Sequence, residues 1–282
     1  MKYAICNETF VDWDHERICH RAAELGYTGL EVAPFTLASR ITDVSAARRT
    51  ELRRQAESAG ISIIGLHWLL AKTEGFYLTT SDAAIRATTA NYFIALAEAC
   101  AELGGQLMVL GSPLQRNLLP GMAHAEADRY AIDTLARCLP TLERTGVTLC
   151  LEPLGPVETN YMNTAASAVA LIRELNHPNV KLHLDVKAMS TESVPIPELI
   201  RANAGDTFHF HANDPNRRGP GFGDTDFRPI FSALQDTEYD GWVSVEVFDY
   251  TPDPDTIARE SLRYMRECVS QDSLSLLTER IS

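Results

Sequence analysis

Two histidines alternate with two phenylalanines in the stretch FHFHAND, residues 208–214. Successive side chains of an extended strand point to opposite faces, so His209 and His211 share one face. Imidazoles bind metals and transfer protons, and they are costly to bury in an apolar strand without partners. The stretch therefore predicts a strand that brings reactive groups to its end.

Three further apolar runs end in a carboxylate. They are VTLCLEP, VKLHLD and GWVSVEVF, which carry Glu152, Asp185 and Glu246. If these runs are neighbouring parallel strands, the carboxylates and His211 meet at the carboxyl ends of the strands. Carboxylates buried close together repel one another unless a cation neutralises them. We therefore predict that Glu152, Asp185, His211 and Glu246 hold one divalent metal ion.

The types of these four groups indicate the metal. Carboxylates and imidazole without a thiolate favour Mn²⁺, with Mg²⁺ or Co²⁺ as substitutes and Zn²⁺ less expected. Taken singly, a strand-end glutamate usually faces water and a strand histidine usually belongs to the core. The equivalent positions of all four groups on four successive runs favour the metal site.

Eight short apolar or alternating runs recur along the 282 residues, with amphipathic helical patterns between them. The runs cover residues 2–7, 29–34, 61–68, 106–111, 147–153, 180–185, 208–214 and 242–248. Helical patterns include residues 15–26, 46–60 and 87–105. Eight strand–helix units without a composition break predict an α/β fold, a (β/α)₈ TIM barrel that forms a single domain over residues 1–282. An open Rossmann-like sheet is the alternative, although no GxGxxG motif follows the first run.

Composition and charge limit the kinds of partner that this protein is expected to bind. The formal net charge of −13 argues against a nucleic-acid partner, because that affinity is built from clustered Lys and Arg. The amino-terminal MKYAICNETFVDWD is too polar for a signal peptide or membrane span, which predicts a cytoplasmic protein without membrane contact. Six scattered cysteines without a CxxC pair predict reduced thiols, with no disulfide and no zinc knuckle.

Several of these segments also carry a resemblance to a known family. They include LEPLGPVETNYMN, LHLD, HFHANDPNR with the glycine-rich loop after it, and YDGWVSVEVF. Over nearly its whole length the chain resembles the xylose-isomerase-like TIM-barrel superfamily of sugar isomerases and epimerases, and within it the tagatose/psicose 3-epimerase-like group. The resemblance implies the same four metal ligands. It also implies that Glu152 and Glu246 exchange a proton next to a substrate carbonyl, through a metal-stabilised enediolate.

The resemblance further implies substrate contacts for Glu158, His209 and Arg217. On the sequence alone, Glu158 reads as an exposed loop residue and Arg217 as part of a solvated turn, which is where we place Arg218. His67, a polar group in an apolar run, is expected to line the pocket. Three other residues are weaker candidates for the pocket wall: Glu31, Trp68 and Cys6.

One position departs from the family pattern. In ketose 3-epimerases a substrate-binding histidine typically stands three residues after the metal aspartate, but here the segment reads DVKAMS and the position is Ala188. Lys187 lies two residues after Asp185 and should point to the same side. It either snorkels to solvent or places a cation beside the metal, and we predict a substrate-binding role for it.

These residues together predict a metal-dependent isomerase or epimerase acting on a small-molecule carbohydrate, a keto sugar. The alternative is a lyase that dehydrates an inosose or cleaves a 3-keto sugar or glycoside. A more remote alternative is an endonuclease IV-like hydrolase, which needs a trinuclear zinc cluster with more ligands than these strand ends supply. A sugar-binding barrel without chemistry is disfavoured by the presence of both glutamates. By analogy with related enzymes, we expect a homo-oligomer, either a dimer or a tetramer.

Overall fold

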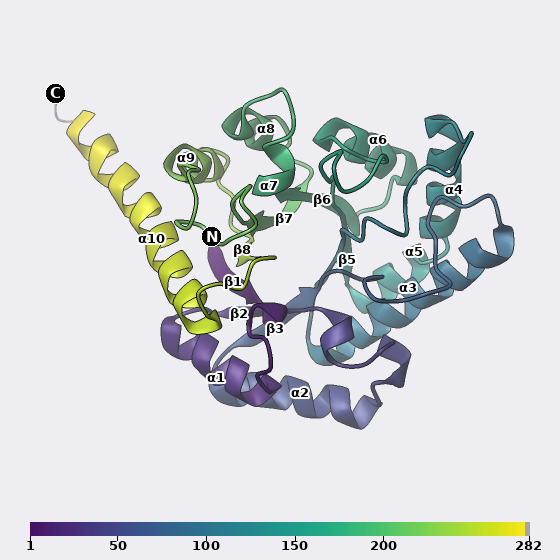
Figure 1. Cartoon of the computed structure of the whole chain (residues 1–282), viewed down its shortest axis with the longest axis horizontal. Helices are drawn as coiled ribbons and strands as arrows, with labels where there is room; N and C mark the ends of the chain where they lie inside the picture. Colours follow the sequence, from purple (N-terminus) through teal and green to yellow (C-terminus); the bar gives the residue numbers. More distant parts are fainter. Residues whose placement is uncertain (280–282) are drawn as a thin grey trace.

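The computed structural model describes the backbone of residues 1–279 and the side chains of residues 1–269. Its eight parallel strands pair in sequence order and close on themselves, with helices around the outside (Figure 1). The strands are β1 (Lys2–Cys6), β2 (Gly29–Val32), β3 (Ser62–Leu66), β4 (Leu107–Leu110), β5 (Thr148–Leu151), β6 (Val180–Asp185), β7 (Thr207–Ala212) and β8 (Trp242–Val245). The closed barrel confirms the predicted fold class, and the open Rossmann-like alternative is wrong.

All eight predicted runs contain a strand, and most strands are shorter than their runs. Because β5 ends at Leu151 and β8 ends at Val245, Glu152 and Glu246 stand directly after a strand rather than within it. Asp185 is the last residue of β6, and His211 is the second-to-last residue of β7. The polar groups therefore all sit at the carboxyl-terminal rim of the barrel.

Ten α-helices and three short 3₁₀ helices surround the strands of the described chain. The α-helices are α1 (His15–Leu25), α2 (Ala46–Ala59), α3 (Ala83–Leu103), α4 (His124–Ala136), α5 (Leu139–Thr145), α6 (Ala165–Leu175), α7 (Val186–Met189), α8 (Ile196–Ala202), α9 (Arg228–Asp236) and α10 (Pro254–Glu279). The 3₁₀ helices are η1 (Asn7–Thr9), η2 (Pro34–Thr36) and η3 (Ile41–Asp43). The predicted single-domain limits of 1–282 extend past the described residues and stay a prediction.

Local signals account for the helix ends. Gly26 and Gly60 end α1 and α2 in the left-handed conformation, with φ of 102° and 77°, as expected of C-terminal capping glycines. Helix α3 begins four residues before its predicted start. The side chain of Asp82 accepts hydrogen bonds from the backbone N–H groups of Ala84 and Ile85, which caps the helix at that earlier position.

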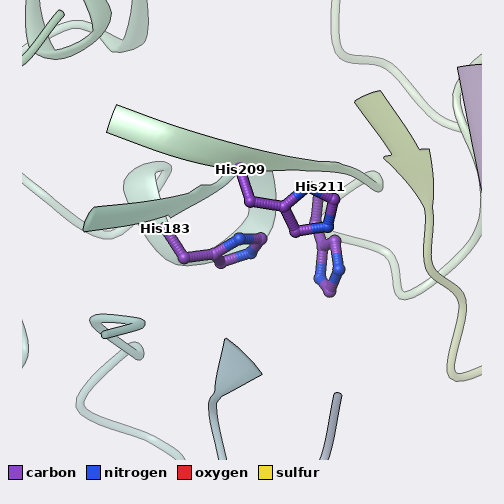
Figure 2. A group of neighbouring side chains, drawn as sticks. All are labelled: His183, His209 and His211. Atoms are coloured by element: carbon purple, nitrogen blue, oxygen red, sulfur yellow. The ribbon is translucent and has the colours of Figure 1, made fainter. Parts of the chain in front are cut away.

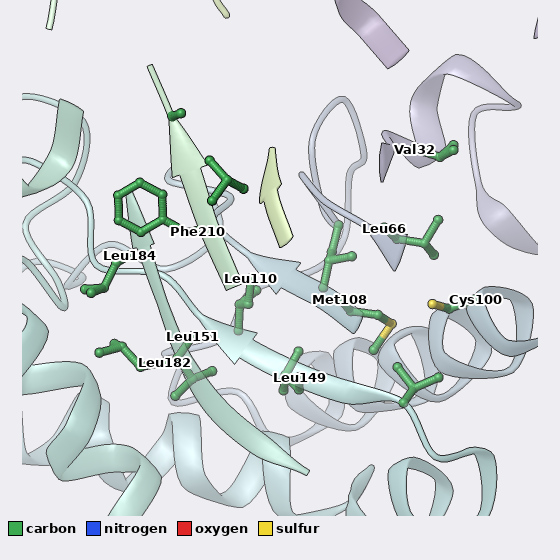
Figure 3. Close-up of a cluster of buried hydrophobic side chains, with 14 of the residues drawn as sticks. Val32, Leu66, Cys100, Met108, Leu110, Leu149, Leu151, Leu182, Leu184 and Phe210 are labelled. Carbon is green, nitrogen blue, oxygen red and sulfur yellow. The ribbon is translucent and has the colours of Figure 1, made fainter. Parts of the chain in front are cut away.

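Because successive side chains of a strand point to opposite faces, the side chains of the strands form two layers. Leucines of β5 and β6 and Phe210 of β7 belong to the large buried cluster shown in Figure 3. Strand residues that point to the opposite face form a smaller cluster. It comprises Ala4, Ile64, Leu107, Val109 and Cys150, with Trp242 packed against it. Nearer the carboxyl ends the same alternation places glutamate, aspartate and histidine. The barrel interior is thus apolar at one end and polar at the other.

All six cysteines are buried, and none of them forms a disulfide within the described residues. No helix within residues 1–279 combines the length and apolar character needed to cross a bilayer.

Candidate active site and metal centre

Strand register brings the predicted ligands together. Asp185 of β6 pairs with His211 of β7, and two residues earlier His183 pairs with His209. All four predicted metal ligands are at most 3% exposed; they are Glu152, Asp185, His211 and Glu246. The barrel therefore buries three carboxylates beside an imidazole, as the sequence pattern predicts.

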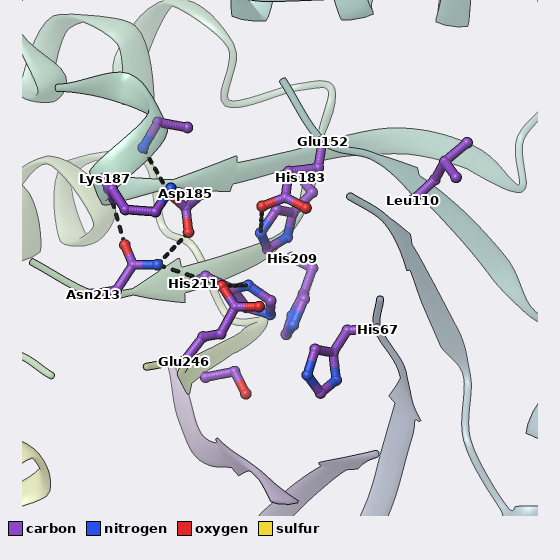
Figure 4. Close-up of polar contacts among 12 residues, drawn as sticks. His67, Leu110, Glu152, His183, Asp185, Lys187, His209, His211, Asn213 and Glu246 are labelled. Atoms are coloured by element: carbon purple, nitrogen blue, oxygen red, sulfur yellow. Dashed lines mark hydrogen bonds and ion pairs between the residues drawn. The ribbon is translucent and has the colours of Figure 1, made fainter. Parts of the chain in front are cut away.

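The tightest group of possible ligand atoms contains one residue that the sequence analysis did not single out. Atoms of Glu152, His183, Asp185 and His211 lie within 4.8 Å of one another. Glu246 lies beside this group, with its Oε2 3.2 Å from Nδ1 of His211 (Figure 4). The structure thus places three predicted ligands in one cluster, with the fourth in contact with His211.

Asn213 fixes the spacing between the carboxylates of this cluster. Its side-chain Nδ2 donates hydrogen bonds to Oδ2 of Asp185 and to Oε2 of Glu246, the latter at 3.4 Å. Its Oδ1 accepts a hydrogen bond from the backbone N–H of Lys187 at 2.9 Å. One amide therefore connects β6, α7 and the end of β8 (Figure 4).

The electrostatics of the cluster favour a bound cation. Burial raises the pKa of Glu152 well above its ordinary value, and Glu246 and Asp185 raise it further. Burial also raises the pKa of Asp185 to about 6, although Lys187 opposes the shift. Oε1 of Glu246 is buried without a hydrogen-bond partner among the described residues. A divalent metal ion would relieve the repulsion between these carboxylates and give the unpartnered oxygen a partner. The ion would be coordinated by these oxygens and by His211.

A buried carboxylate explains the two histidines on one face of β7. Oε2 of Glu31, on β2, accepts hydrogen bonds from Nε2 of His209 at 2.8 Å and from Nε2 of His211 at 3.1 Å. Figure 2 shows the rings of His183, His209 and His211 on adjacent strands. Although burial raises the pKa of Glu31, the two imidazoles hold it well below its ordinary value. Because Glu31 holds Nε2 of His211, that ring presents Nδ1 to the site, the arrangement usual for a metal-binding imidazole.

His67 lies near the site and pairs with a residue of η1. Nε2 of His67 is 2.9 Å from Oε2 of Glu8, and both side chains are buried. Ligand atoms of Glu8, His67 and Glu246 lie within 4.8 Å of one another. Although burial lowers the pKa of His67, Cys6 and Glu8 raise it well above its ordinary value. His67 is therefore placed at the site, but its predicted contact with substrate stays a prediction.

Lys187 turns inward rather than toward solvent. Its side chain is 13% exposed, and its Nζ lies 2.7 Å from Oε2 of Glu158 and 5.0 Å from the ring of Phe248. Burial lowers the pKa of Lys187, but Asp185 and Glu158 raise it more, so the lysine keeps its charge. Two residues predicted to bind substrate thus form one ion pair beside the cluster of candidate metal ligands.

Arg217 and Arg218 belong to one turn but make different contacts, and the predicted substrate contact of Arg217 stays a prediction. Arg217 has a left-handed backbone with φ of 74° and lines a cavity next to the site. Arg218 makes an ion pair with Asp249 at 2.9 Å and a hydrogen bond to Thr251 at 3.0 Å. Arg218 therefore stabilises the loop after β8, whereas the guanidinium of Arg217 lies at the cavity wall, 6.0 Å from the centroid of the Phe248 ring.

Two residues that follow β4 position Glu152. A Cβ at Gly111 would lie 1.5 Å from Oε2 of Glu152, so only glycine leaves room for that carboxylate. The fully buried Arg116 donates hydrogen bonds from Nη1 to the carbonyl oxygens of Leu110 at 3.3 Å and Glu152 at 2.7 Å. The position of Glu152 is therefore fixed in two ways. Arg116 holds its backbone carbonyl, and Gly111 leaves the space that its carboxylate occupies.

The geometry agrees with a comparison of the whole chain with known protein families. Residues 19–268 match the model of the xylose isomerase-like TIM barrel family. The chain belongs to this family. The resemblance that the sequence motifs indicate is thus confirmed, and the barrel-mouth carboxylates occupy the rim where such barrels build their active sites.

The members of the family that resemble this chain include sugar epimerases. D-psicose 3-epimerase of Agrobacterium fabrum is 30% identical over 246 residues, which cover 84% of this chain and 82% of the relative. 3-Dehydro-D-guloside 4-epimerase of Escherichia coli is 30% identical over 177 residues, covering 61% of this chain and 68% of the relative. A solved structure of L-ribulose 3-epimerase superposes with a TM-score of 0.85 at 22% identity. The match covers 100% of this chain and 98% of that one and is a similarity of fold.

Sequence reasoning missed His183, Glu8, Asn213 and Arg116. His183 could have been found, because it stands two residues before Asp185 and so shares its face of β6. Asn213 follows His211 by the same spacing. Glu8 lies in a 3₁₀ turn and Arg116 in a loop, where no periodicity predicts the direction of a side chain.

Proposed function

We propose that this protein is a metal-dependent epimerase or isomerase of a keto sugar. One observation carries the proposal: Glu152, Asp185, His211 and Glu246 stand in this order at the carboxyl ends of four successive strands. The two glutamates therefore lie at opposite ends of the row. A sugar carbon held above Asp185 and His211 would meet one carboxylate on each face. The names of the epimerase relatives point to the same chemistry.

The two glutamates would move a single proton each. One carboxylate removes the proton from the carbon next to the substrate carbonyl, which leaves an enediolate. The other glutamate, in its acid form, returns a proton to the opposite face of that carbon, so the product differs at one centre. In the reverse reaction the roles exchange. Lys187, held by Glu158, would place a positive charge beside the oxygens that gain negative charge.

We propose that Glu152, Asp185, His211 and Glu246 hold one divalent ion, Mn²⁺ in preference to Mg²⁺ or Co²⁺, with Zn²⁺ less suited to this ligand set. When bound, the ion polarises the carbonyl and hydroxyl oxygens of the sugar and so stabilises the enediolate. Asn213 positions the carboxylates of Asp185 and Glu246 by donating hydrogen bonds to both, and Glu31 keeps Nδ1 of His211 directed into the site.

Deuterium exchange tests this function directly. The purified protein is loaded with Mn²⁺ and incubated in D₂O with a panel of ketoses, inososes and 3-keto sugars, and the products are examined by NMR. We expect deuterium at one carbon of a productive substrate, with no exchange after chelation. Glu246→Gln should abolish exchange, whereas Glu143→Gln, a change at an exposed residue of α5, should not. Exchange that survives in Glu246→Gln would remove Glu246 from the mechanism.

The same experiment separates epimerisation from elimination. Ala188 stands where ketose 3-epimerases carry a substrate-binding histidine, and the inward Lys187 supplies a proton donor instead; both observations favour the lyase alternative. In elimination, the base takes the proton next to the carbonyl, the carbon–oxygen bond at the next carbon breaks, and the leaving oxygen gains a proton. An unsaturated product that absorbs ultraviolet light would identify a lyase, and two sugars differing at one centre an epimerase.

We further propose that the protein works as a dimer or tetramer in the cytoplasm. Two strongly exposed apolar side chains support an interface: Leu114, in the loop after β4, and Val157, in the loop after β5, are 70% and 91% exposed. The two loops are joined because Oδ1 of Asn160 accepts a hydrogen bond from the backbone N–H of Leu118 at 2.7 Å. Sedimentation equilibrium would show a monomer if this is wrong.

A further inference from the structure

A cavity of about 730 Å³ opens beside the proposed metal site. Segments that follow β1, β2, β3, β7 and β8 supply its walls, which include Glu8, Trp13, Phe35, Trp68, Arg217 and Phe248. Glu8 connects the cavity to the site, because its carboxylate lies within 4.8 Å of the ligand atoms of His67 and Glu246. The cavity therefore begins at one of the two glutamates proposed to move protons.

Three aromatic rings form a row along this cavity. The ring centroids of Phe35 and Trp68 are 5.8 Å apart, and those of Trp68 and Phe248 are 5.6 Å apart in a stacked arrangement. A lysine lies at each end of the row: Nζ of Lys72 is 4.1 Å from the centroid of the Phe35 ring, and Nζ of Lys187 is 5.0 Å from that of Phe248. The row thus runs from the proposed metal site outward.

The backbone around the cavity is unusually strained. Seven residues of the described chain other than glycine have a positive φ, and four of them line this one cavity: Asp12 (63°), Trp68 (51°), Lys72 (57°) and Arg217 (74°). A left-handed conformation disfavours a residue with a Cβ, and such residues concentrate where a protein shapes a ligand site. The four come from three separate segments of the chain, so the strain belongs to the cavity rather than to one loop.

We propose that this cavity binds a second ring joined to the reacting sugar, so that the substrate is a keto sugar in glycosidic linkage rather than a free ketose. The inference rests on the proposed function, which it makes more specific. A volume of about 730 Å³ beside the proposed metal site leaves room for one further ring. Phe35, Trp68 and Phe248 are each partly exposed and give the cavity an aromatic wall against which a sugar or aromatic ring can pack. Polar neighbours such as Asp12 and Arg217 suit the hydroxyl groups of a sugar.

Binding of unreactive glycosides tests the cavity apart from any chemistry. Trp13 and Trp68 line the cavity, whereas Trp242 packs against the apolar cluster at the other end of the barrel, so a Trp242→Phe background makes fluorescence report on the cavity. Methyl glucoside, phenyl glucoside and cellobiose serve as probes with one ring, an aromatic second ring and a sugar second ring. We expect a Kd at least tenfold lower for at least one two-ring probe than for methyl glucoside, and the tighter of the two identifies the kind of ring.

Matched variants locate the second ring. Phe35→Leu should raise the Kd of the preferred two-ring probe about threefold to tenfold, a change typical of a lost aromatic stack, and should affect methyl glucoside less. Phe248→Leu is a second cavity variant in case the first fails to fold. Phe208→Leu is the control, because that ring lies on β7, 39% exposed and outside the cavity wall. Equal Kd values for all probes, or no effect of either folded cavity variant, would overturn the proposal.

Kinetics completes the test and keeps the two proposals separate. We expect kcat/KM for the 3-keto derivative of the preferred two-ring probe to exceed that of methyl 3-ketoglucoside at least tenfold, with the advantage reduced in Phe35→Leu. Tight two-ring binding without metal-dependent deuterium exchange on any keto sugar would leave the cavity assignment intact and refute the proposed function. Exchange on keto sugars with no preference for two-ring substrates would support the proposed function and refute the cavity assignment.

Discussion

Gly111→Ala tests the proposed site without altering any charged residue. The new Cβ would lie 1.5 Å from Oε2 and 2.7 Å from Cδ of Glu152, whereas ordinary contact begins at 3.4 Å. The oxygen must therefore move by about 2 Å, and the whole carboxylate must turn with it. A misplacement of about 1 Å in a reacting group can cost roughly 10²-fold in rate. We expect kcat/KM to fall at least 10²-fold and Mn²⁺ affinity to fall roughly 10- to 100-fold, the range reported for disturbed metal-site geometry.

The assay is isothermal titration with Mn²⁺ together with deuterium exchange on the productive substrate. Gly205→Ala is the matched control, because a Cβ there meets nothing within 4 Å, and it should behave like the parent protein. Overpacking by one methyl group costs about 1–3 kcal/mol, so thermal unfolding must show that Gly111→Ala remains folded. A folded Gly111→Ala with unchanged Mn²⁺ affinity and exchange would refute the role of Glu152 in the site.

Four further substitutions separate positioning, charge and surface roles. Glu31→Gln should lower Mn²⁺ affinity about 10- to 100-fold while the protein stays folded, because Glu31 orients the ring of His211; unchanged affinity in a titration would contradict this. Lys187→Met keeps the length of the side chain but removes its charge, and should lower kcat at least tenfold with metal content unchanged, as measured by elemental analysis. Arg217→Ala should raise KM or lower kcat/KM, whereas Arg218→Ala should be nearly silent in activity; equal losses would assign the function to the whole turn.

The strand positions of the candidate ligands could be read from the sequence. Glu152, Asp185, His211 and Glu246 each end an apolar run, and the period of a strand fixes which face such a residue takes. Eight such runs with helices between them imply a closed barrel, and a parallel barrel places all of its carboxyl ends on one rim. Local chain geometry alone thus predicts that the four groups converge.

Contacts between distant segments could not be read in this way. Nothing in GLEV indicates that Glu31 bridges His209 and His211, because that contact depends on barrel closure across 178 and 180 residues. The direction of Lys187 depended on whether Glu158 lies within reach of its Nζ, and only the packed loop after β5 supplies that partner.

The cavity beside the site is likewise a property of the tertiary structure. Phe35, Trp68 and Phe248 come from segments that follow three different strands, and each looks like an ordinary apolar residue in the sequence. Sequence periodicity determines which face of a strand carries a side chain, because that depends on neighbouring backbone angles. Which side chains meet across the barrel mouth depends on how the loops pack, and the strained backbones of Trp68 and Arg217 exist only in that packed state.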